Sequence, residues 1–230
     1  MKRKSLIIPL IIVAVFLLYQ GVKPNPKTAI IIDPINEESE FKTKSMNLLK
    51  DNGYKITYIS GEEVTVKLLK NLPKDHDIYI FRVHSTCINN RTWIFSGEKY
   101  QTESHSLMQL ADLVHKARPS LTSAYYFAVS PELIKKYNPD SFTNSIILMM
   151  GCKGLVTNDL ADAFCSEGAS TYVSWDGNVC LEHTDQAYIA LLEAICTEKS
   201  SISMAINHVS STIGSDPVYL SVLKAYSLGT

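Results

Sequence analysis

The chain has 230 residues, of which 46% are hydrophobic and 20% are charged. This composition can bury one sizeable core, and it excludes a disordered tail, a collagen-like fibre and a small disulfide-stapled module. Five of the 22 basic residues and no acidic residue fall in residues 1–27, so residues 28–230 hold 17 bases against 23 acids, a net charge of −6. This charge argues against a nucleic-acid partner, because nonspecific nucleic-acid affinity comes from Lys and Arg that neutralise phosphates.

The N-terminus has the pattern of a targeting segment. Lys2, Arg3 and Lys4 precede an apolar run at residues 6–19. The length of the run fits a signal peptide, but no small-residue cleavage site follows it, which favours an uncleaved membrane anchor. The basic residues favour a cytoplasmic N-terminus. We therefore expect residues 1–27 to be a leader or anchor with its linker, and residues 28–230 to be one domain outside the cytoplasm, membrane-anchored or secreted.

The first half of the domain alternates short apolar runs with amphipathic stretches. Gly53 supplies a C-cap for the first predicted helix, and Ser96-Gly97 between apolar flanks predicts a hairpin turn. The predicted elements are strands at 28–32, 54–59 and 77–83, helices at 41–52, 64–69 and 106–117, and a hairpin at 93–100.

The second half repeats the alternation. The predicted elements are strands at 124–129, 145–150 and 171–175, and helices at 159–167, 184–196 and 201–211. Continuous apolar strands separated by helices indicate an α/β fold of three layers, with a mostly parallel sheet covered by helices on both faces.

Five cysteines have no metal-ligand spacing. There is no CxxC pair and no His/Cys cluster, so we expect no metal and no cofactor. An odd number leaves at least one thiol unpaired in an exported domain, where it is either buried and inert or kept for its chemistry. The cysteines are Cys87, Cys152, Cys165, Cys180 and Cys196.

Two chemically active residues end the most apolar predicted strands. His84 follows the strand at 77–83, and Gly151-Cys152 follows the strand at 145–150. In parallel sheets the ligand site lies at the carboxyl ends of the strands, so neighbouring strands would bring the two side chains together as a Cys/His dyad. Gly151 would allow a sharp turn and the approach of a substrate backbone. The alternative is that Cys152 is a small hydrophobe and His84 an ordinary loop histidine.

These segments resemble the caspase-like cysteine peptidases of clan CD, nearest to gingipain-like and CHAT-like members. The resemblance rests on IYIFRVHS, on IILMMGCKG with Cys152-Lys153-Gly154, and on the stretch LADAFCSEGASTYVSWDGN. It implies a caspase-haemoglobinase-like fold, a nucleophile at Cys152 and a base at His84. It also implies an oxyanion hole at Ser85 and Gly151-Cys152, although Ser85 replaces the glycine usual after the histidine.

The resemblance further implies a specificity pocket. Ser174-Trp175-Asp176 stands where caspases carry Ser-Trp-Arg, so an acid at this place would select Arg or Lys in a peptide or protein substrate. Asp176 could instead start a turn with Gly177, and Trp175 could be a core residue. Asp33 and Arg82 could each be either site residues or ordinary strand-end and strand charges, and Asp185 is more simply an acid at a helix start.

The sequence thus predicts a cysteine endopeptidase that cleaves after Arg or Lys. The main alternative is a catalytically silent caspase-like module that binds or signals. A flavodoxin-like binder of small molecules is disfavoured because no Gly-rich phosphate loop is present.

Overall fold

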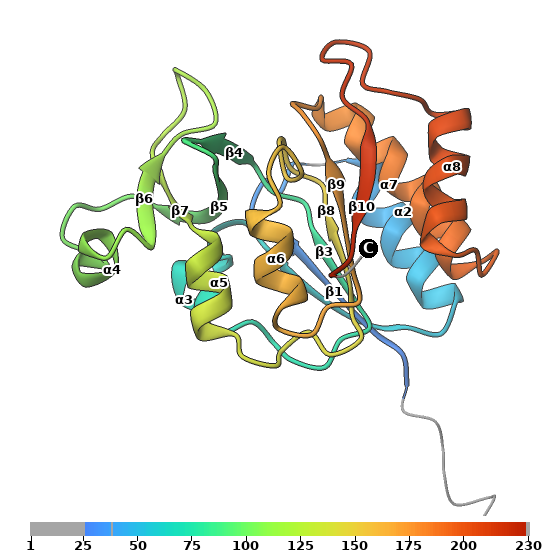
Figure 1. Cartoon of the computed structure of the whole chain (residues 1–230), viewed down its shortest axis with the longest axis horizontal. Coiled ribbons are helices and arrows are strands. Elements are labelled where there is room, and N and C mark those ends of the chain that lie inside the picture. Colours follow the sequence, from blue (N-terminus) through green and yellow to red (C-terminus); the bar gives the residue numbers. More distant parts are fainter. Residues whose placement is uncertain (1–25, 38, 229–230) are drawn as a thin grey trace, which may run out of the picture.

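The computed structural model describes residues 26–37 and 39–228. Figure 1 shows a central sheet with helices on two sides and a smaller sheet next to it. The predicted leader at residues 1–27 falls, except for its last two residues, outside the described part. No helix within the described residues is both long and apolar enough to cross a membrane.

Six strands form the central sheet in the order β10-β9-β8-β3-β1-β2. All neighbouring strands are parallel except β10, which pairs antiparallel with β9 at one edge. The strands are β1 (Thr28–Asp33), β2 (Lys55–Ser60), β3 (Ile78–Phe81), β8 (Ile146–Met149), β9 (Thr171–Trp175) and β10 (Leu223–Tyr226). The predicted mostly parallel sheet is confirmed.

Helices cover both faces of this sheet, because alternate strand residues point to opposite sides. Ile30, Phe81 and Met149 belong to one buried cluster, and Ile31, Ile80 and Leu148 to the other. The first face is covered by α3 (Val66–Lys70), α5 (Pro131–Tyr137) and α6 (Asp159–Cys165), and the second by α2 (Glu40–Asp51), α7 (Leu181–Cys196) and α8 (Ile202–Thr212). The α/β layering predicted from the sequence is therefore present.

The end of α2 explains why the predicted helix at 41–52 agrees with the observed one to within one residue at each end. Gly53 has φ of +79°, its N–H binds the carbonyl of Lys50, and the N–H of Tyr54 binds the carbonyl of Leu49. These two bonds make a Schellman cap, which a glycine in the left-handed region supplies without steric cost.

A second, antiparallel sheet was not predicted. Its strands lie in the order β4-β5-β7-β6, namely β4 (Ser85–Ile88), β5 (Arg91–Lys99), β7 (Tyr126–Val129) and β6 (Val114–Ala117). In Figure 1 it lies on the left beside the carboxyl ends of the central strands, together with the short helix α4 (Ser106–Leu110). Since β4 begins one residue after His84, this sheet borders the predicted site.

The predicted hairpin at 93–100 is wrong. Residues 91–99 form the single strand β5, which leaves the regular register between Phe95 and Lys99. Gly97 is needed there because a Cβ would lie 1.8 Å from the carbonyl oxygen of Gly61. The turn is instead at Asn89 and Asn90, both with positive φ, which connect β4 to β5.

The predicted helix at 106–117 is also wrong in its second half. The helix α4 ends at Leu110, Asp112 has φ of +59°, and β6 begins at Val114. Pairing of β6 with β7 overrides the local helical pattern. The helix α5 and the strand β10 had no counterpart among the predicted elements.

Candidate active site

His84 and Cys152 lie at matching positions on neighbouring parallel strands. β3 pairs with β8 so that Phe81 is opposite Met149, and His84 and Cys152 are each three residues beyond that pair. Both therefore emerge at the carboxyl edge of the sheet, in the middle of its strand order. This arrangement is the one that the dyad hypothesis requires of the backbone.

The Cys152 thiol faces the loop between β9 and α7. Its Sγ receives a hydrogen bond from the N–H of Val179 at 3.4 Å and donates to the carbonyl of Val179 at 3.5 Å. Burial raises the pKa of Cys152, opposed by the hydrogen bond with Val179 and by the charge of Lys153. A raised thiol pKa means that the group is a protonated thiol at neutral pH, so it needs a base to become a nucleophile.

The His84 imidazole lies beside the second sheet. It packs against Phe95 with ring centroids 6.3 Å apart, and it lines a cavity of about 190 Å³ together with Glu37, Ser96 and Tyr126. Burial lowers the pKa of His84, against the opposing charge of Glu37. The ring is therefore neutral near pH 7, which is the form that can accept a proton.

No hydrogen bond joins this imidazole to the thiol among the described residues. The backbones of His84 and Cys152 come together at the sheet edge. The Cys152 thiol, however, is hydrogen-bonded to Val179, and the His84 ring faces the cavity beside Phe95. The dyad stays a prediction, with the arrangement of the strands in its favour.

Gly151 is required by the close approach of neighbouring atoms. A Cβ there would lie 2.1 Å from Oγ of Ser85 and 2.8 Å from the carbonyl oxygen of Val83. The chain bends at Gly151 and turns over residues 152–155, and the φ of Gly151 is not in the positive range. The left-handed residue is instead Lys153, with φ of +59°.

Ser85 fixes the loop that carries Cys152 to the second sheet. Its hydroxyl donates to the carbonyl of Cys152 at 2.6 Å. The N–H of Phe95 binds the carbonyl of His84, so in the alternating antiparallel ladder the next pair, Ser85 and Ile94, is a pair without mutual hydrogen bonds. The Ser85 N–H therefore points away from β5, at the edge of its sheet, and is available to another acceptor.

Trp175 and Asp176 differ in their surroundings. Trp175 is fully buried, and its Nε1–H donates to Thr184 at 2.9 Å, so its side chain is part of the core. The Asp176 carboxylate receives the N–H of Val222 at 2.8 Å and forms an ion pair with Lys224 at 2.8 Å. The acid suggested for substrate recognition thus already has a cationic partner from β10.

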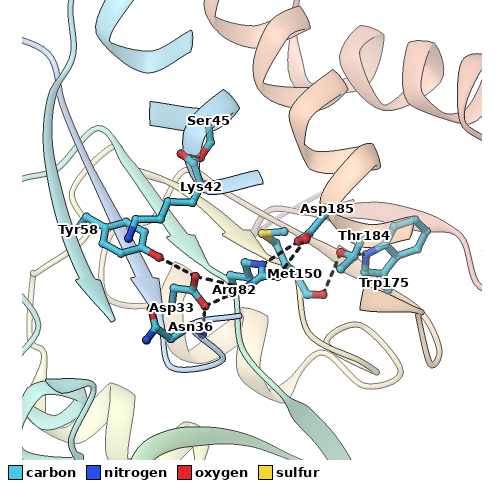
Figure 2. A network of polar contacts seen from close by, with 10 residues as sticks. All are labelled: Asp33, Asn36, Lys42, Ser45, Tyr58, Arg82, Met150, Trp175, Thr184 and Asp185. Atoms are coloured by element: carbon cyan, nitrogen blue, oxygen red, sulfur yellow. Dashed lines mark hydrogen bonds and ion pairs between the residues drawn. The ribbon is translucent and has the colours of Figure 1, made fainter. Parts of the chain in front are cut away.

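A buried charge cluster lies under the same edge, as Figure 2 shows. The Arg82 guanidinium binds Asp185 of α7 through Nε at 2.8 Å and Nη2 at 3.0 Å, and Asp33 of β1 through Nη1 at 3.2 Å. Tyr58 donates to the other oxygen of Asp33 at 2.8 Å. Arg82 and Asp33 are each only 1% exposed.

The sequence did not predict that these three charges meet. The available signal was an arginine inside the predicted apolar strand at 77–83, one residue beyond the observed β3, because a buried guanidinium needs carboxylate partners. Its partners lie 49 and 103 residues away, and sequence alone does not pair them. The cluster joins β1, β3 and α7 directly below the loops that carry His84 and Cys152.

No protein-family model matches the chain. No curated protein matches it either.

Proposed function

We propose that the domain is a caspase-like cysteine endopeptidase with Cys152 as nucleophile and His84 as base. The observation that carries the proposal is the register of β3 and β8, which brings both residues to the same point of the carboxyl edge. A mostly parallel sheet with helices on both faces is also the architecture that the sequence resemblance implies.

The protonation states suit acyl transfer by a neutral pair. A neutral His84 would take the proton of Cys152 as sulfur attacks the scissile carbonyl carbon, and would later give that proton to the leaving amine. Catalytic hydrogen bonds are often long in empty sites and tighten when substrate binds. We therefore propose that peptide binding turns the thiol from Val179 toward the imidazole.

Backbone N–H groups would hold the developing oxyanion. The Ser85 N–H points away from β5, and the bond from its hydroxyl to the Cys152 carbonyl keeps it next to the nucleophile loop. Together with the N–H of Cys152 it would stabilise the tetrahedral intermediate. Water would then hydrolyse the acyl-enzyme with His84 as base.

Cleavage after Arg or Lys is the specificity that we propose. In this view Asp176 exchanges the Lys224 ammonium for the substrate cation, at the same 2.8 Å contact. Removal of Lys224 should then favour basic substrates further, whereas Asp176→Asn should abolish the preference. Equal cleavage profiles of wild type, Lys224→Ala and Asp176→Asn on a peptide library would refute this assignment.

Labelling of the nucleophile tests the activity itself. A peptidyl acyloxymethyl ketone with a basic end residue should modify Cys152 alone, and His84→Ala should abolish labelling while the variant remains folded by circular dichroism. Cys87→Ala is the matched control, because Cys87 is half-buried and its Sγ faces Thr157 at 4.0 Å, outside the proposed site.

A catalytically silent binding module is the second candidate. It is favoured by the absence, among the described residues, of a hydrogen bond between the Cys152 thiol and the His84 ring. Such a module would show no site-selective labelling by the ketone probe, and His84→Ala would leave the labelling pattern unchanged.

We also propose that the domain acts outside the cytoplasm, because of the basic and apolar residues at the start of the chain. Protease added to intact cells should digest residues 28–230. Digestion only after lysis would place the domain in the cytoplasm.

A further inference from the structure

A second thiol lies next to the proposed nucleophile. The Cys152 Sγ touches both the N–H and the carbonyl of Val179, and the following residue is Cys180. Because the peptide unit is planar, the Cα of Cys180 lies next to that carbonyl oxygen, within a side chain's length of the Cys152 sulfur. Burial and the carboxylate of Asp216 raise the pKa of Cys180, and charge on Cys152 raises it further. Both residues are half-buried free thiols.

A fixed carboxylate lies beside this second thiol. Asp216 accepts the N–H of Cys180 at 2.7 Å through Oδ2, and its Oδ1 receives the Cys180 S–H at 3.8 Å. Oδ1 also receives the N–H groups of Val218 and Tyr219, at 2.9 and 2.7 Å. The Asp216 side chain is fully buried, so these bonds hold the carboxylate in place against the thiol.

We propose that Cys152 and Cys180 form a regulatory dithiol pair that a hydroperoxide oxidises to a disulfide. The Cys152 sulfur attacks the peroxide, the O–O bond breaks, and Cys152 sulfenic acid and an alcohol or water form. The Cys180 sulfur then attacks the sulfenic sulfur and passes its proton to Asp216. Hydroxide leaves with that proton as water, so two thiols are oxidised as one peroxide is reduced.

The remaining cysteines are placed differently. Cys165 and Cys196 are buried in helices at 5% and 1% exposure. Cys87 lies on β4 with its sulfur 4.0 Å from the Thr157 hydroxyl, away from the loop that holds Val179 and Cys180. The geometry therefore selects Cys180 as the partner, and the disulfide would block the nucleophile reversibly.

Mass spectrometry of the reduced full chain after hydrogen peroxide and maleimide treatment tests the pair. A peptide linked through Cys152 and Cys180 should appear, and a thiol reductant should remove it. In Cys180→Ser the link should be lost and dimedone should trap sulfenic acid at Cys152. Cys87→Ser, the matched control, should form the link as fully as wild type.

Two outcomes would overturn the pair. One is the absence of a 152–180 link in a wild type that circular dichroism shows to be folded. The other is equal dimedone trapping with and without Cys180, in Cys180→Ala as well as Cys180→Ser. The readout needs no peptidase activity, so a linked chain that cleaves no peptide would support the dithiol pair while refuting the proposed function.

Discussion

The carboxyl edge of the central sheet has two halves with different packing. The inner half, at the ends of β3 and β8, holds the Arg82 cluster and Gly151, with no room for one added carbon at Gly151. The outer half, at the carboxyl end of β9 and the amino end of the antiparallel β10, holds the Asp176–Lys224 ion pair, whose side chains are 25% and 55% exposed. At this edge, opposite charges are thus paired both in the core and at the surface.

This difference bears on how a site at such an edge can work. Buried charges held by several bonds keep backbone positions fixed, because any movement would leave a charge without its partner. An exposed pair gains little from its Coulomb attraction and can exchange partners with solvent or a ligand. The inner half is therefore suited to positioning His84 and Cys152, and the outer half to recognising a charged side chain.

The largest expected effect of breaking this arrangement is at Arg82. Arg82→Met removes the partner of Asp33 and Asp185 while keeping a long apolar side chain. Breaking a buried ion pair on one side typically costs about 3–5 kcal/mol. We expect a loss of this size in the free energy of unfolding, measured by urea denaturation. A loss below about 1 kcal/mol would mean that the cluster is hydrated like a surface pair.

Gly151→Ala should have the next largest effect. Its Cβ would overlap the Ser85 hydroxyl, which can rotate, and the Val83 carbonyl, which cannot move without shifting the strand end. Overpacking of this kind costs about 1–3 kcal/mol. Urea denaturation of Gly151→Ala and of the double variant with Ser85→Ala separates the loss due to the Ser85 hydroxyl from the loss due to the Val83 carbonyl.

Gly177→Ala is the matched control in the outer half. Its added Cβ would meet the Cβ of Ser221 at 3.0 Å, a milder overlap than the 2.1 and 2.8 Å contacts at Gly151. We expect a smaller loss of stability than in Gly151→Ala. An equal or larger loss would contradict the difference in packing between the two halves.

The inner half was the more predictable from sequence. The continuous apolar runs at β3 and β8 placed His84 and Cys152 on one edge. Continuous apolar runs and a glycine-capped helix are local signals, so no tertiary contact is needed to predict them.

The outer half and the second sheet depend on contacts between distant residues. Lys224 pairs with Asp176 only because β10 adds to the sheet, and that four-residue strand carries no strong pattern of its own. Ser96-Gly97 has a turn composition, yet Gly97 is there because Gly61 approaches β5. The structure of these segments is therefore determined by tertiary packing and not by local propensity.

Acid should destabilise the loop that leads to β10. Hydrogen bonds from Cys180, Tyr219 and Val218 lower the pKa of Asp216, although burial opposes them. An aspartate in the unfolded chain titrates near pH ~4, so it binds a proton there that the folded chain takes up only at lower pH. Asp216 therefore contributes stability above pH ~4 that is lost as pH falls.

The variant Asp216→Asn isolates this contribution. Urea denaturation between pH ~6 and pH ~3 should show a smaller fall in the free energy of unfolding than in wild type, whatever the variant's stability at neutral pH. If the free energy of unfolding falls equally with pH in the two proteins, the pKa of Asp216 is the same in the folded and the unfolded chain.

The smallest expected effect is at the ion pair of the outer half. Lys224→Ala removes one charge from a contact that solvent reaches, and Asp176 keeps its hydrogen bond from the Val222 N–H. Exposed pairs contribute about 0–1 kcal/mol, and salt screens them. Urea denaturation should therefore show a loss below about 1 kcal/mol that shrinks further at high salt. A salt-independent loss in the free energy of unfolding close to that of Arg82→Met would mean that Lys224 stabilises β10 as strongly as Arg82 stabilises the ends of β1 and β3. In that case Asp176 could not release its partner to receive a substrate cation.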